Sequence, residues 1–371
     1  MQVEANEMNA VGTSTADNAE TNECKEKRNK PKGTKFRQQK LPAWQPILTA
    51  STVIPAFFAV GVIFIPIGAL LLSASNSVIE RVYDYTACRN QQNKNCSTIL
   101  AGDPRADCEC VVKMTLTEFE NAGDLYFYYG LTNFYQNHRR YVKSRNDDQL
   151  LGDLDSTDNC APFDRNSTTM QKIVPCGAVA NSMFNDTFEL YLSDRSDEES
   201  QWTPVPLTYK NIAWSIDRQR KFVNPSDMNK FNSYSMPPSW SRPINELDPD
   251  DPENNGFQNV DFMVWMRTAA LPSFRKLWRR LDRTAHEFSD GLPAGNYTLK
   301  IKYRYPTSSF SGNKTFIIST TSWLGGKNSF LGVAYIVVGS LCIALCFVFA
   351  VIHWKFGKSL AELSAVTGGN A

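Results

Sequence analysis

The chain has 371 residues and a hydrophobic content of 42%, which is ample for a folded core. Its 39 basic and 38 acidic residues leave a formal net charge of +1, so overall charge does not attract it to nucleic acid or another polyanion. The distribution of charged and apolar residues along the chain is more informative.

The N-terminal tail, residues 1–46, is polar at its start and basic near its end. We expect the first 26 residues to be disordered, because they contain few residues that could form a core. The stretch KRNKPKGTKFRQQK (27–40) has seven Lys or Arg and no acid. LPAWQP follows, and its tryptophan and prolines suit the membrane interface. A positive-inside anchor explains the basic run better than attraction to anionic lipids, which stays an alternative.

Two apolar segments, residues 47–75 and 328–352, contain no Asp, Glu, Lys or Arg. Crossing a bilayer takes about 20 apolar residues. Both segments exceed the apolar core of a signal peptide, about 7 to 15 residues, so we predict two transmembrane helices rather than a cleaved signal or soluble core helices. The basic run places the N-terminus in the cytosol. The C-terminal tail, 353–371, is then also cytosolic, and residues 76–327 form a lumenal or extracellular ectodomain.

Small residues recur at seven-residue intervals in both predicted transmembrane helices. They are Gly61, Gly68 and Ser75 in the first, and Gly332, Gly339 and Cys346 in the second. Seven residues make nearly two helical turns, so each set forms a stripe where another helix can approach closely. The stripes predict packing of the two helices on each other or on a partner.

The ectodomain has the features of an oxidising, glycosylating compartment. Its five sequons are at Asn95, Asn166, Asn185, Asn296 and Asn313, and neither tail has one. Six of the nine cysteines are Cys88, Cys96, Cys108, Cys110, Cys160 and Cys176, which predicts three disulfides. Cys108 and Cys110 are too close in sequence to bond each other easily, so each should pair with Cys88 or Cys96. We prefer disulfides to the alternative, in which Cys108 and Cys110 supply two ligands of a metal site.

Strand patterns dominate the ectodomain. In YTLKIKYRY (297–305), large apolar and aromatic residues alternate with polar ones, and further strands are expected at 111–117, 124–131, 186–192 and 314–323. One helix is expected over 260–281, broken or kinked at Pro272. The fold class is therefore two transmembrane helices plus a mainly antiparallel, sandwich-like β ectodomain with helical and irregular insertions.

The sequence contains no recognisable catalytic, cofactor or metal motif. GxSxG, HExxH and GxxxxGK patterns are missing. DPDDPENNG (248–256) resembles a calcium loop, but Phe262 stands where the loop needs a bidentate Glu, so a turn is the better interpretation. We expect no catalytic residues, no cofactor and no metal, and no ion path within this chain's uncharged helices.

The segment HRRYVKSR, residues 138–145, follows an aromatic run and is typical of a phosphate or nucleic-acid surface. Its location outside the cytosol excludes nucleic acid as a partner. The ectodomain's 29 basic and 31 acidic residues also argue against a broad polyanion-binding surface. The segment therefore needs another role.

Five long stretches resemble the cell division control protein 50 family. They are FRQQKLPAWQPILT (36–49), YYGLTNFYQNHRRYVKSR (128–145), PCGAVANSMFNDT (175–187), DFMVWMRTAALPSFRKL (261–277) and SWLGGKNSFLG (322–332). The resemblance covers most of the chain and implies the topology predicted above. It also implies the disulfides Cys88–Cys110, Cys96–Cys108 and Cys160–Cys176, and it makes Asn185 the sequon of the family's NDT motif. Val260 departs from the acid expected before Asp261, which puts a polar contact there in doubt.

The family's members are non-catalytic β-subunits of type IV P-type ATPases, which flip phospholipids. The resemblance implies that this chain forms a heterodimer with such a pump and supports the pump's folding and exit from the endoplasmic reticulum. The endoplasmic reticulum, Golgi, endosomes or plasma membrane would then hold the complex, with phosphatidylserine and phosphatidylethanolamine moved toward the cytosolic leaflet. A two-span trimeric ligand-gated channel is the alternative, and a free-standing adhesion or receptor ectodomain is a third possibility.

Within that family, the basic segment is expected to help the ectodomain dock on the pump's short exoplasmic loops. Tyr and Arg are enriched at the centres of protein interfaces. The candidate docking residues are Tyr135, His138, Arg139, Arg140 and Tyr141. The alternative is internal salt bridging, for example with Asp147 and Asp148.

Overall fold

The computed structural model describes residues 34–36, 39, 41, 49–103, 105–193 and 202–357. The expectations for the disordered N-terminus, for Trp44 and for the last residues of the C-terminal tail lie outside these ranges. The predictions for the two transmembrane helices and for nearly all of the ectodomain lie within them.

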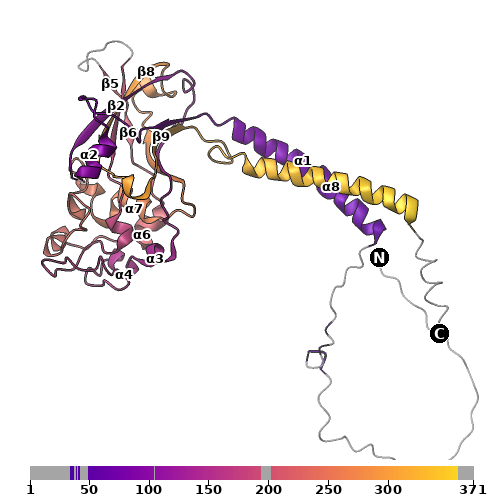
Figure 1. Ribbon diagram of the computed structural model, residues 1–371, viewed down its shortest axis with the longest axis horizontal. Coiled ribbons are helices and arrows are strands. Elements are labelled where there is room, and N and C mark those ends of the chain that lie inside the picture. The colour runs from indigo at the N-terminus through magenta and orange to yellow at the C-terminus, as the bar shows by residue number, and fades with distance from the viewer. Residues whose placement is uncertain are drawn as a thin grey trace, which may run out of the picture. The chain divides into compact units, whose positions relative to one another are not determined.

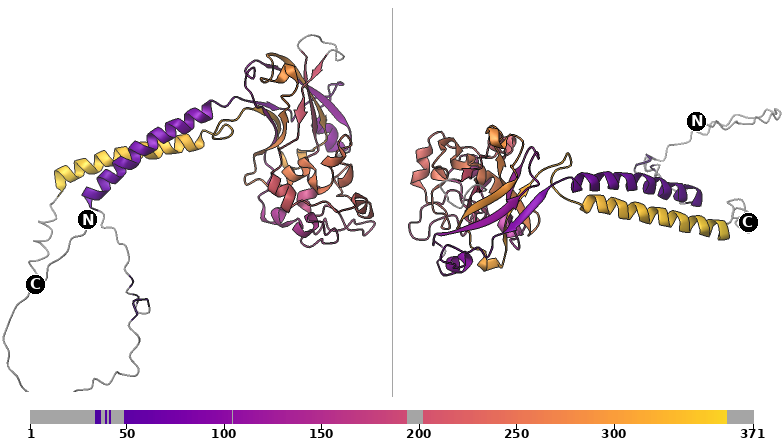
Figure 2. Two further views of the ribbon diagram at one scale, coloured as in Figure 1. Left: turned by 180° about the vertical axis from the view of Figure 1, so that it is seen from behind. Right: turned by 90° about the horizontal axis from the view of Figure 1, so that it is seen from above.

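Two helices of 27 residues each, α1 (Ala50–Asn76) and α8 (Phe330–Phe356), bracket the ectodomain in sequence. At 1.5 Å per residue each is about 40 Å long, enough to cross about 30 Å of hydrocarbon. Most of their large apolar side chains are exposed, unlike those of a soluble core helix. The two helices lie side by side in both views of Figure 2. They confirm the two predicted membrane helices.

The ectodomain contains two antiparallel sheets. The five-stranded sheet has the order β1 (Glu80–Asp84), β9 (Lys314–Ser319), β3 (Tyr126–Leu131), β7 (Phe274–Leu281) and β6 (Leu207–Thr208). The four-stranded sheet has the order β2 (Cys108–Leu116), β8 (Gly295–Tyr303), β4 (Thr187–Leu192) and β5 (Thr203–Pro204). Every strand pair in these sheets is antiparallel, as the sequence predicts.

Strand β8 shows why the alternating pattern predicts the sheet well. Tyr297, Leu299, Ile301 and Tyr303 are fully buried on one face, while Lys302 is exposed on the other. Thr298 is also buried, although the alternation places it on the polar face; its hydroxyl is hydrogen-bonded to the Ser193 hydroxyl at 2.9 Å. A buried hydroxyl needs such a partner.

The two sheets pack face to face through aromatic side chains. The ring of Phe188, on β4, has its centroid 5.0 Å from that of Phe316 on β9 and 5.1 Å from that of Trp278 on β7. Edge-to-face and tilted ring pairs of this kind stabilise a core beyond the area they bury. This packing gives the sandwich-like ectodomain expected from the sequence.

The helix predicted over 260–281 is wrong in its second half. Helix α7 covers only Val260–Met266, with the Asn259 side chain accepting a hydrogen bond from the Phe262 amide at its start. Residues 274–281 instead form β7, which pairs with β3 and β6. The helix ends before Pro272, and β3 supplies a strand partner that sequence periodicity alone does not show.

Shorter helices fill the connections between strands, and several of them lie together at one end of the ectodomain in Figure 1. They are α2 (Cys96–Gly102), α3 (Arg139–Lys143), α4 (Asp147–Leu150), α5 (Ala178–Asn181) and α6 (Ser215–Arg220). Six 3₁₀ helices complete the described elements: η2 (Met228–Ser233), η3 (Ile244–Glu246), η4 (Pro252–Asn254), η5 (Gly256–Gln258), η6 (His286–Phe288) and η7 (Ser308–Phe310).

Three disulfides hold the ectodomain's loops. They join Cys88 to Cys110, Cys96 to Cys108 and Cys160 to Cys176, with Cα–Cα distances of 6.0, 5.6 and 5.6 Å. Cys108 and Cys110 lie on the same buried face of β2, because residues two apart in a strand point the same way. This face receives both nested bridges, in the pairing that the family resemblance implies.

Candidate functional site

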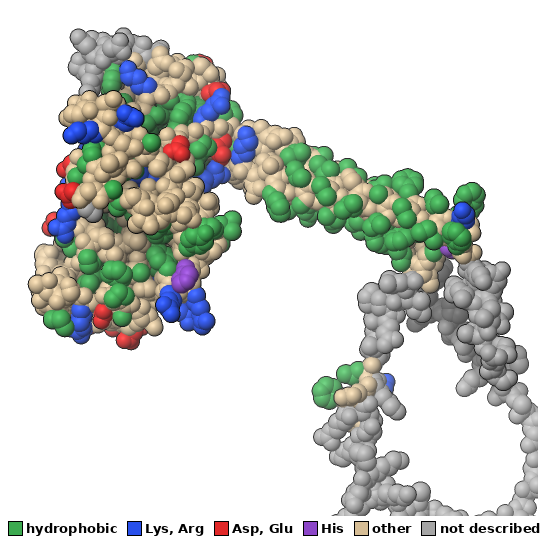
Figure 3. All heavy atoms as spheres, in the orientation of Figure 1, with side chains coloured by type: hydrophobic (Ala, Val, Ile, Leu, Met, Phe, Trp, Pro, Cys, Tyr) green, Lys and Arg blue, Asp and Glu red, His purple; other side chains and the backbone are tan. Residues whose placement is uncertain are grey.

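The two membrane helices contact each other along the small-residue stripes. Gly61, Gly68, Ser75 and Ala74 are the buried residues of α1, and Gly332, Gly339 and Cys346 are those of α8. The remaining surface of both helices is largely apolar, as Figure 3 shows. The stripes therefore serve packing within the chain, and the outer faces are left for lipid or for another protein's helices.

At the stripes, the backbones of α1 and α8 lie close to each other. A Cβ atom added to Gly68 would lie 2.9 Å from the carbonyl oxygen of Gly332, and one added to Gly332 would lie 2.8 Å from the amide nitrogen of Leu72. At the ectodomain end of the pair, the amide of Asn328 donates to the Ser75 hydroxyl at 3.0 Å. Any larger side chain in the stripes would push the helices apart.

In the ectodomain, four of the five candidate docking residues are exposed together. Tyr135 is 57% exposed, and His138, Arg139 and Arg140 at the start of α3 are also exposed. Among the described residues, Arg139 and Arg140 have no ion-pair partner. Figure 3 shows a histidine and Lys or Arg side chains gathered at the α3 end, beside hydrophobic side chains.

The loop 268–273 lies against this segment. Asn137 donates its side-chain amide to the Ala270 carbonyl at 2.8 Å, and the Phe134 amide donates to the Pro272 carbonyl at 3.0 Å. Between these anchors Leu271 is 67% exposed. We name the combined surface the α3 patch, defined as Tyr135, His138, Arg139, Arg140 and Leu271. Leu271 was missed from the sequence, because its segment was predicted to be helical.

Tyr141, the fifth candidate, points inward. Its hydroxyl is 2.9 Å from the Ser182 hydroxyl, and its ring packs edge-on against Phe134 with centroids 5.8 Å apart. Burial raises the pKa of Tyr141 to about 12. The salt-bridge alternative is confirmed for the last residue of the segment 138–145, because Arg145 pairs with Asp147 at 3.0 Å. The segment thus has an inner structural face and an outer free face.

A buried ion pair lies between the two sheets. The ammonium of Lys314 is 2.7 Å from Asp186 Oδ2, and both side chains are 0% exposed. Asp186 Oδ1 accepts the amides of Arg304 and Tyr305 at 2.6 and 2.7 Å, and the Tyr85 hydroxyl donates to Oδ2 at 2.9 Å. Burial lowers the pKa of Lys314 to about 8, opposed by the carboxylate, and burial raises the pKa of Tyr85.

Comparison with known proteins gives a family for the whole chain. The profile of the LEM3 (ligand-effect modulator 3) family / CDC50 family matches residues 71–359. The chain is 50% identical to cell cycle control protein 50A of Mus musculus over 343 residues, which cover 90% of this chain and 92% of the relative. It belongs to the CDC50 family. It is also 46% identical to cell cycle control protein 50B of Homo sapiens, with 88% and 94% covered.

A plant relative in the same family carries a more informative name. The putative ALA-interacting subunit 4 of Arabidopsis thaliana is 40% identical over 337 residues, covering 89% of this chain and 92% of the relative. The family match at residues 71–359 spans the ectodomain and α8, and the relatives cover about 90% of the chain, in agreement with the resemblance seen in the sequence.

The departure at Val260 does not remove polar contacts from this part of the CDC50-family fold. Val260 is only 3% exposed and packs in the core. Asp261 itself forms a two-point pair with Arg279, with N–O distances of 2.7 and 3.0 Å. The carboxylate raises the pKa of Arg279 against the opposing effect of burial. The missing acid is therefore not needed to fix α7 to β7.

The five sequons of this CDC50-family chain differ in their surroundings. Asn296 and Asn313 are exposed, whereas Asn95, Asn166 and Asn185 are half-buried. Asn95 caps α2 through the Ser97 amide, and Asn166 accepts the Thr168 amide, both at 2.9 Å. Asn185 differs from these two because its Oδ1 atom is buried and makes no hydrogen bond to any residue that the structure describes.

Proposed function

We propose that this chain is a non-catalytic β-subunit that forms a heterodimer with a phospholipid-flipping type IV P-type ATPase. The observation that carries the proposal is 40% identity, over 89% of the chain, to a relative named as an interacting subunit. The chain supports the pump's folding, its exit from the endoplasmic reticulum, and the movement of phosphatidylserine and phosphatidylethanolamine to the cytosolic leaflet. The complex resides in the endoplasmic reticulum, Golgi, endosomes or plasma membrane.

The membrane helices support a subordinate role in transport. Residues 47–75 and 328–352 contain no Asp, Glu, Lys or Arg, and their small-residue stripes are used up in packing on each other. Charged or polar groups usually line a path for ions or headgroups through the bilayer. The pump supplies that path and the ATP hydrolysis, and this chain offers apolar helix faces for association.

The first test is a mild-detergent pull-down of the tagged full-length chain from its native membranes, with partners identified by mass spectrometry. A P-type ATPase recovered in a one-to-one ratio is the expected result. Recovery of the chain alone, or as a homotrimer with agonist-evoked current in the absence of a pump, would reject the subunit role and support the channel alternative.

The α3 patch is the proposed contact with the pump's exoplasmic loops. It combines two arginines that lack an ion-pair partner among the described residues with an exposed tyrosine and leucine. Arg and Tyr supply much of the binding energy at interface centres, whereas isolated surface charges contribute little to folding. The α3 patch is therefore expected to contribute more free energy to partner binding than to the stability of the ectodomain.

Substitution of both Arg139→Ala and Arg140→Ala is expected to reduce co-purification of the pump at least about tenfold, equivalent to about 1.4 kcal/mol, because interface arginines are lost. The melting temperature of the purified chain should stay the same, since both side chains are exposed. Arg220→Ala with Lys230→Ala removes the same charge from other exposed positions and should change neither quantity. Unchanged pump recovery in the first variant would exclude docking through the patch.

A further inference from the structure

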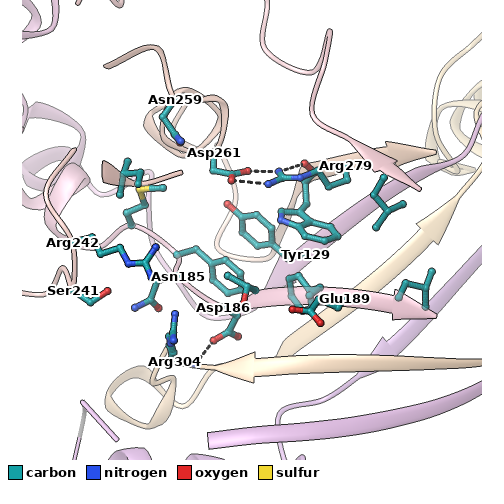
Figure 4. Close-up of a pocket in the computed structure, with 18 of the residues that line it drawn as sticks. Tyr129, Asn185, Asp186, Glu189, Ser241, Arg242, Asn259, Asp261, Arg279 and Arg304 are labelled. Atoms are coloured by element: carbon teal, nitrogen blue, oxygen red, sulfur yellow. Dashed lines mark hydrogen bonds and ion pairs between the residues drawn. The ribbon is translucent and has the colours of Figure 1, made fainter. Parts of the chain in front are cut away.

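A pocket of about 510 Å³ lies beside the Asn185 sequon. Its walls come from β4, from residues 204–207, from the segment 239–247, from α7 and from β7. Figure 4 shows Asn185 with Ser241, Arg242 and Arg304 around it on one side, and the Asp261–Arg279 pair on the other. The volume falls within the range of sites that hold small ligands, about 300 to 1,000 Å³.

The residues on either side of Asn185 are anchored in the core beside this pocket. Phe184 is 7% exposed, and Asp186 is held by the buried ion pair with Lys314. The two residues flanking Asn185 are thus anchored in the core, and its own side chain lines the pocket. Thr187, the hydroxyl residue of the sequon, is exposed at the start of β4.

The side-chain amide of Asn185 makes no hydrogen bond among the described residues. Its Oδ1 is buried without a hydrogen-bond partner among the described residues, which is unfavourable for a polar group. Nδ2 makes no hydrogen bond among the described residues, yet it is not among their buried unpaired atoms, so it is accessible. The nitrogen that accepts a glycan therefore has no hydrogen bond among the described residues, and the side chain that carries it lines the pocket.

The pocket walls match the chemistry of a sugar. Trp240 and Trp278 offer apolar ring surface, and both are 9% exposed. Ser241 and Arg242 are exposed at the rim and have no hydrogen-bond partner among the described residues. A pyranose ring presents C–H groups on its faces and hydroxyl and acetamide groups at its edge, so it can use both kinds of wall.

We propose that this pocket is the seat of the innermost N-acetylglucosamine residues of a glycan carried by Asn185 itself. Attachment forms the bond from Nδ2 to C1 of the sugar and breaks the bond from C1 to the diphosphate of a lipid-linked oligosaccharide donor, while Nδ2 loses a proton. The seated sugars then fill the pocket, cover the Asn185 amide and link β4 to the segment 239–247. This goes beyond the proposed subunit function and does not depend on it.

The test uses the full chain produced in a secretory cell line that retains high-mannose glycans. Site-resolved mass spectrometry first establishes occupancy at each sequon. Native digestion with peptide-N-glycosidase F should then release the Asn185 glycan about tenfold more slowly than the glycan of an exposed sequon such as Asn296, because the sugar must first leave its seat. Equal release rates, or an unmodified Asn185, would overturn the proposal.

Variants at the rim make the test specific. Ser241→Ala with Arg242→Ala should bring the release rate at Asn185 to that of Asn296 and leave other sites unchanged. Ser215→Ala with Arg220→Ala, at exposed positions of α6, is the matched control and should change no rate. If the rim variant leaves the Asn185 rate unchanged, or alters every site equally, the pocket is not the seat.

A second measurement needs no variant and so avoids failures of folding. Endoglycosidase H leaves one N-acetylglucosamine on each asparagine, whereas peptide-N-glycosidase F removes it. The melting temperature of the chain should stay the same after endoglycosidase H and fall after peptide-N-glycosidase F. Because peptide-N-glycosidase F converts the asparagine to aspartate as it removes the sugar, a Thr187→Ala chain, which keeps Asn185 but cannot be glycosylated there, is the control. After endoglycosidase H treatment this chain should also melt below the treated wild type. Equal melting temperatures after both enzymes would contradict a seated first sugar.

Discussion

Among single residues, Lys314 and Asp186 form a fully buried ion pair inside the ectodomain. A charge without water around it is tolerated only where its hydrogen bonds are complete. Lys314 meets this condition through Asp186, through the Tyr305 carbonyl at 2.8 Å, and through the face of the Tyr303 ring, 3.0 Å away at the centroid. Asp186 also fixes the backbone beside the Asn185 sequon.

Replacing Lys314→Met should lower the free energy of unfolding by about 3 to 5 kcal/mol, because a buried carboxylate is left unpaired. Lys302→Met is the matched control: its pair with Glu189 spans 3.4 Å, and both side chains are about half exposed, at 48% and 47%. Exposed pairs contribute about 0 to 1 kcal/mol. Thermal unfolding of the two purified variants measures the difference, and similar losses would show that the buried pair is dispensable.

Lys276 provides a pH-dependent contribution to stability. Its side chain is buried, and its ammonium donates to the carbonyls of Val264 and Trp265 at 2.9 and 3.1 Å, at the end of α7. Burial, with a smaller effect of Arg267, lowers the pKa of Lys276 to about 7. An unfolded lysine keeps its proton up to about pH 10.4, so between these values the unfolded state binds more protons and stability rises with pH.

The expected result is a melting temperature that rises from pH 7 to pH 9 in wild type and rises less in Lys276→Met. The free energy of unfolding obtained from these melts should differ between the two proteins in its slope against pH. The difference should approach about 1.4 kcal/mol per pH unit, the contribution of one titrating proton. Identical slopes in the two proteins would mean that Lys276 keeps its proton in the folded state. Lys302→Met, at an exposed position, controls for the loss of one positive charge.

At the scale of elements, the α1–α8 pair is set by glycine rather than by large apolar contacts. Gly68→Leu should separate the helices, because even its Cβ would lie within 2.9 Å of the Gly332 carbonyl oxygen. Ala69→Leu adds the same bulk on an exposed face and should have no effect. The readout uses Ile54→Cys, since the Ile54 carbonyl is 3.5 Å from Cys346 Sγ. Mass spectrometry of the oxidised membranes should find the cross-link to Cys346 in the Ala69 variant and lose it in the Gly68 variant.

Persistence of that cross-link with Gly68→Leu would show that the helices tolerate bulk at the stripe. They would then be held together by other contacts, such as the edge-to-face pair of Phe57 and Phe349, whose ring centroids are 5.6 Å apart.

At the scale of the whole molecule, the topology has a direct test. In sealed microsomes, trypsin should remove a tag from the N-terminal tail, where residues 27–40 hold seven Lys or Arg, and leave the ectodomain intact until detergent is added. Glycosidase should shift only the protected fragment, because the sequons lie in residues 76–327. A soluble lumenal protein serves as the control for sealing. An ectodomain cut in sealed vesicles would reverse the orientation.

Much of the fold could be predicted where one residue pattern has one physical solution. Uncharged runs of more than 20 residues are long enough to cross a membrane. The alternation of residues 297–305 predicted β8, because one face of this strand meets the core. The edge strand β1, with the sequence ERVYD, was missed because it has no such alternation. β7 was missed because RKLWRRL suits a helix equally well until β3 offers it a partner.

The candidate sites also divide into features that the sequence predicts and features that need the tertiary structure. The sequence alone determined the two membrane helices, the small-residue stripes, the compartment of the cysteines and sequons, and the family, since each depends on residue type and spacing along the chain. Only the tertiary structure decided that the stripes face each other, that Tyr141 points inward while Arg139 and Arg140 are exposed, and that Asn185 lines a pocket. These depend on segments far apart in sequence, such as 134–137 against 269–272, and the free energy that brings them together comes from burial and hydrogen bonding that no local pattern records.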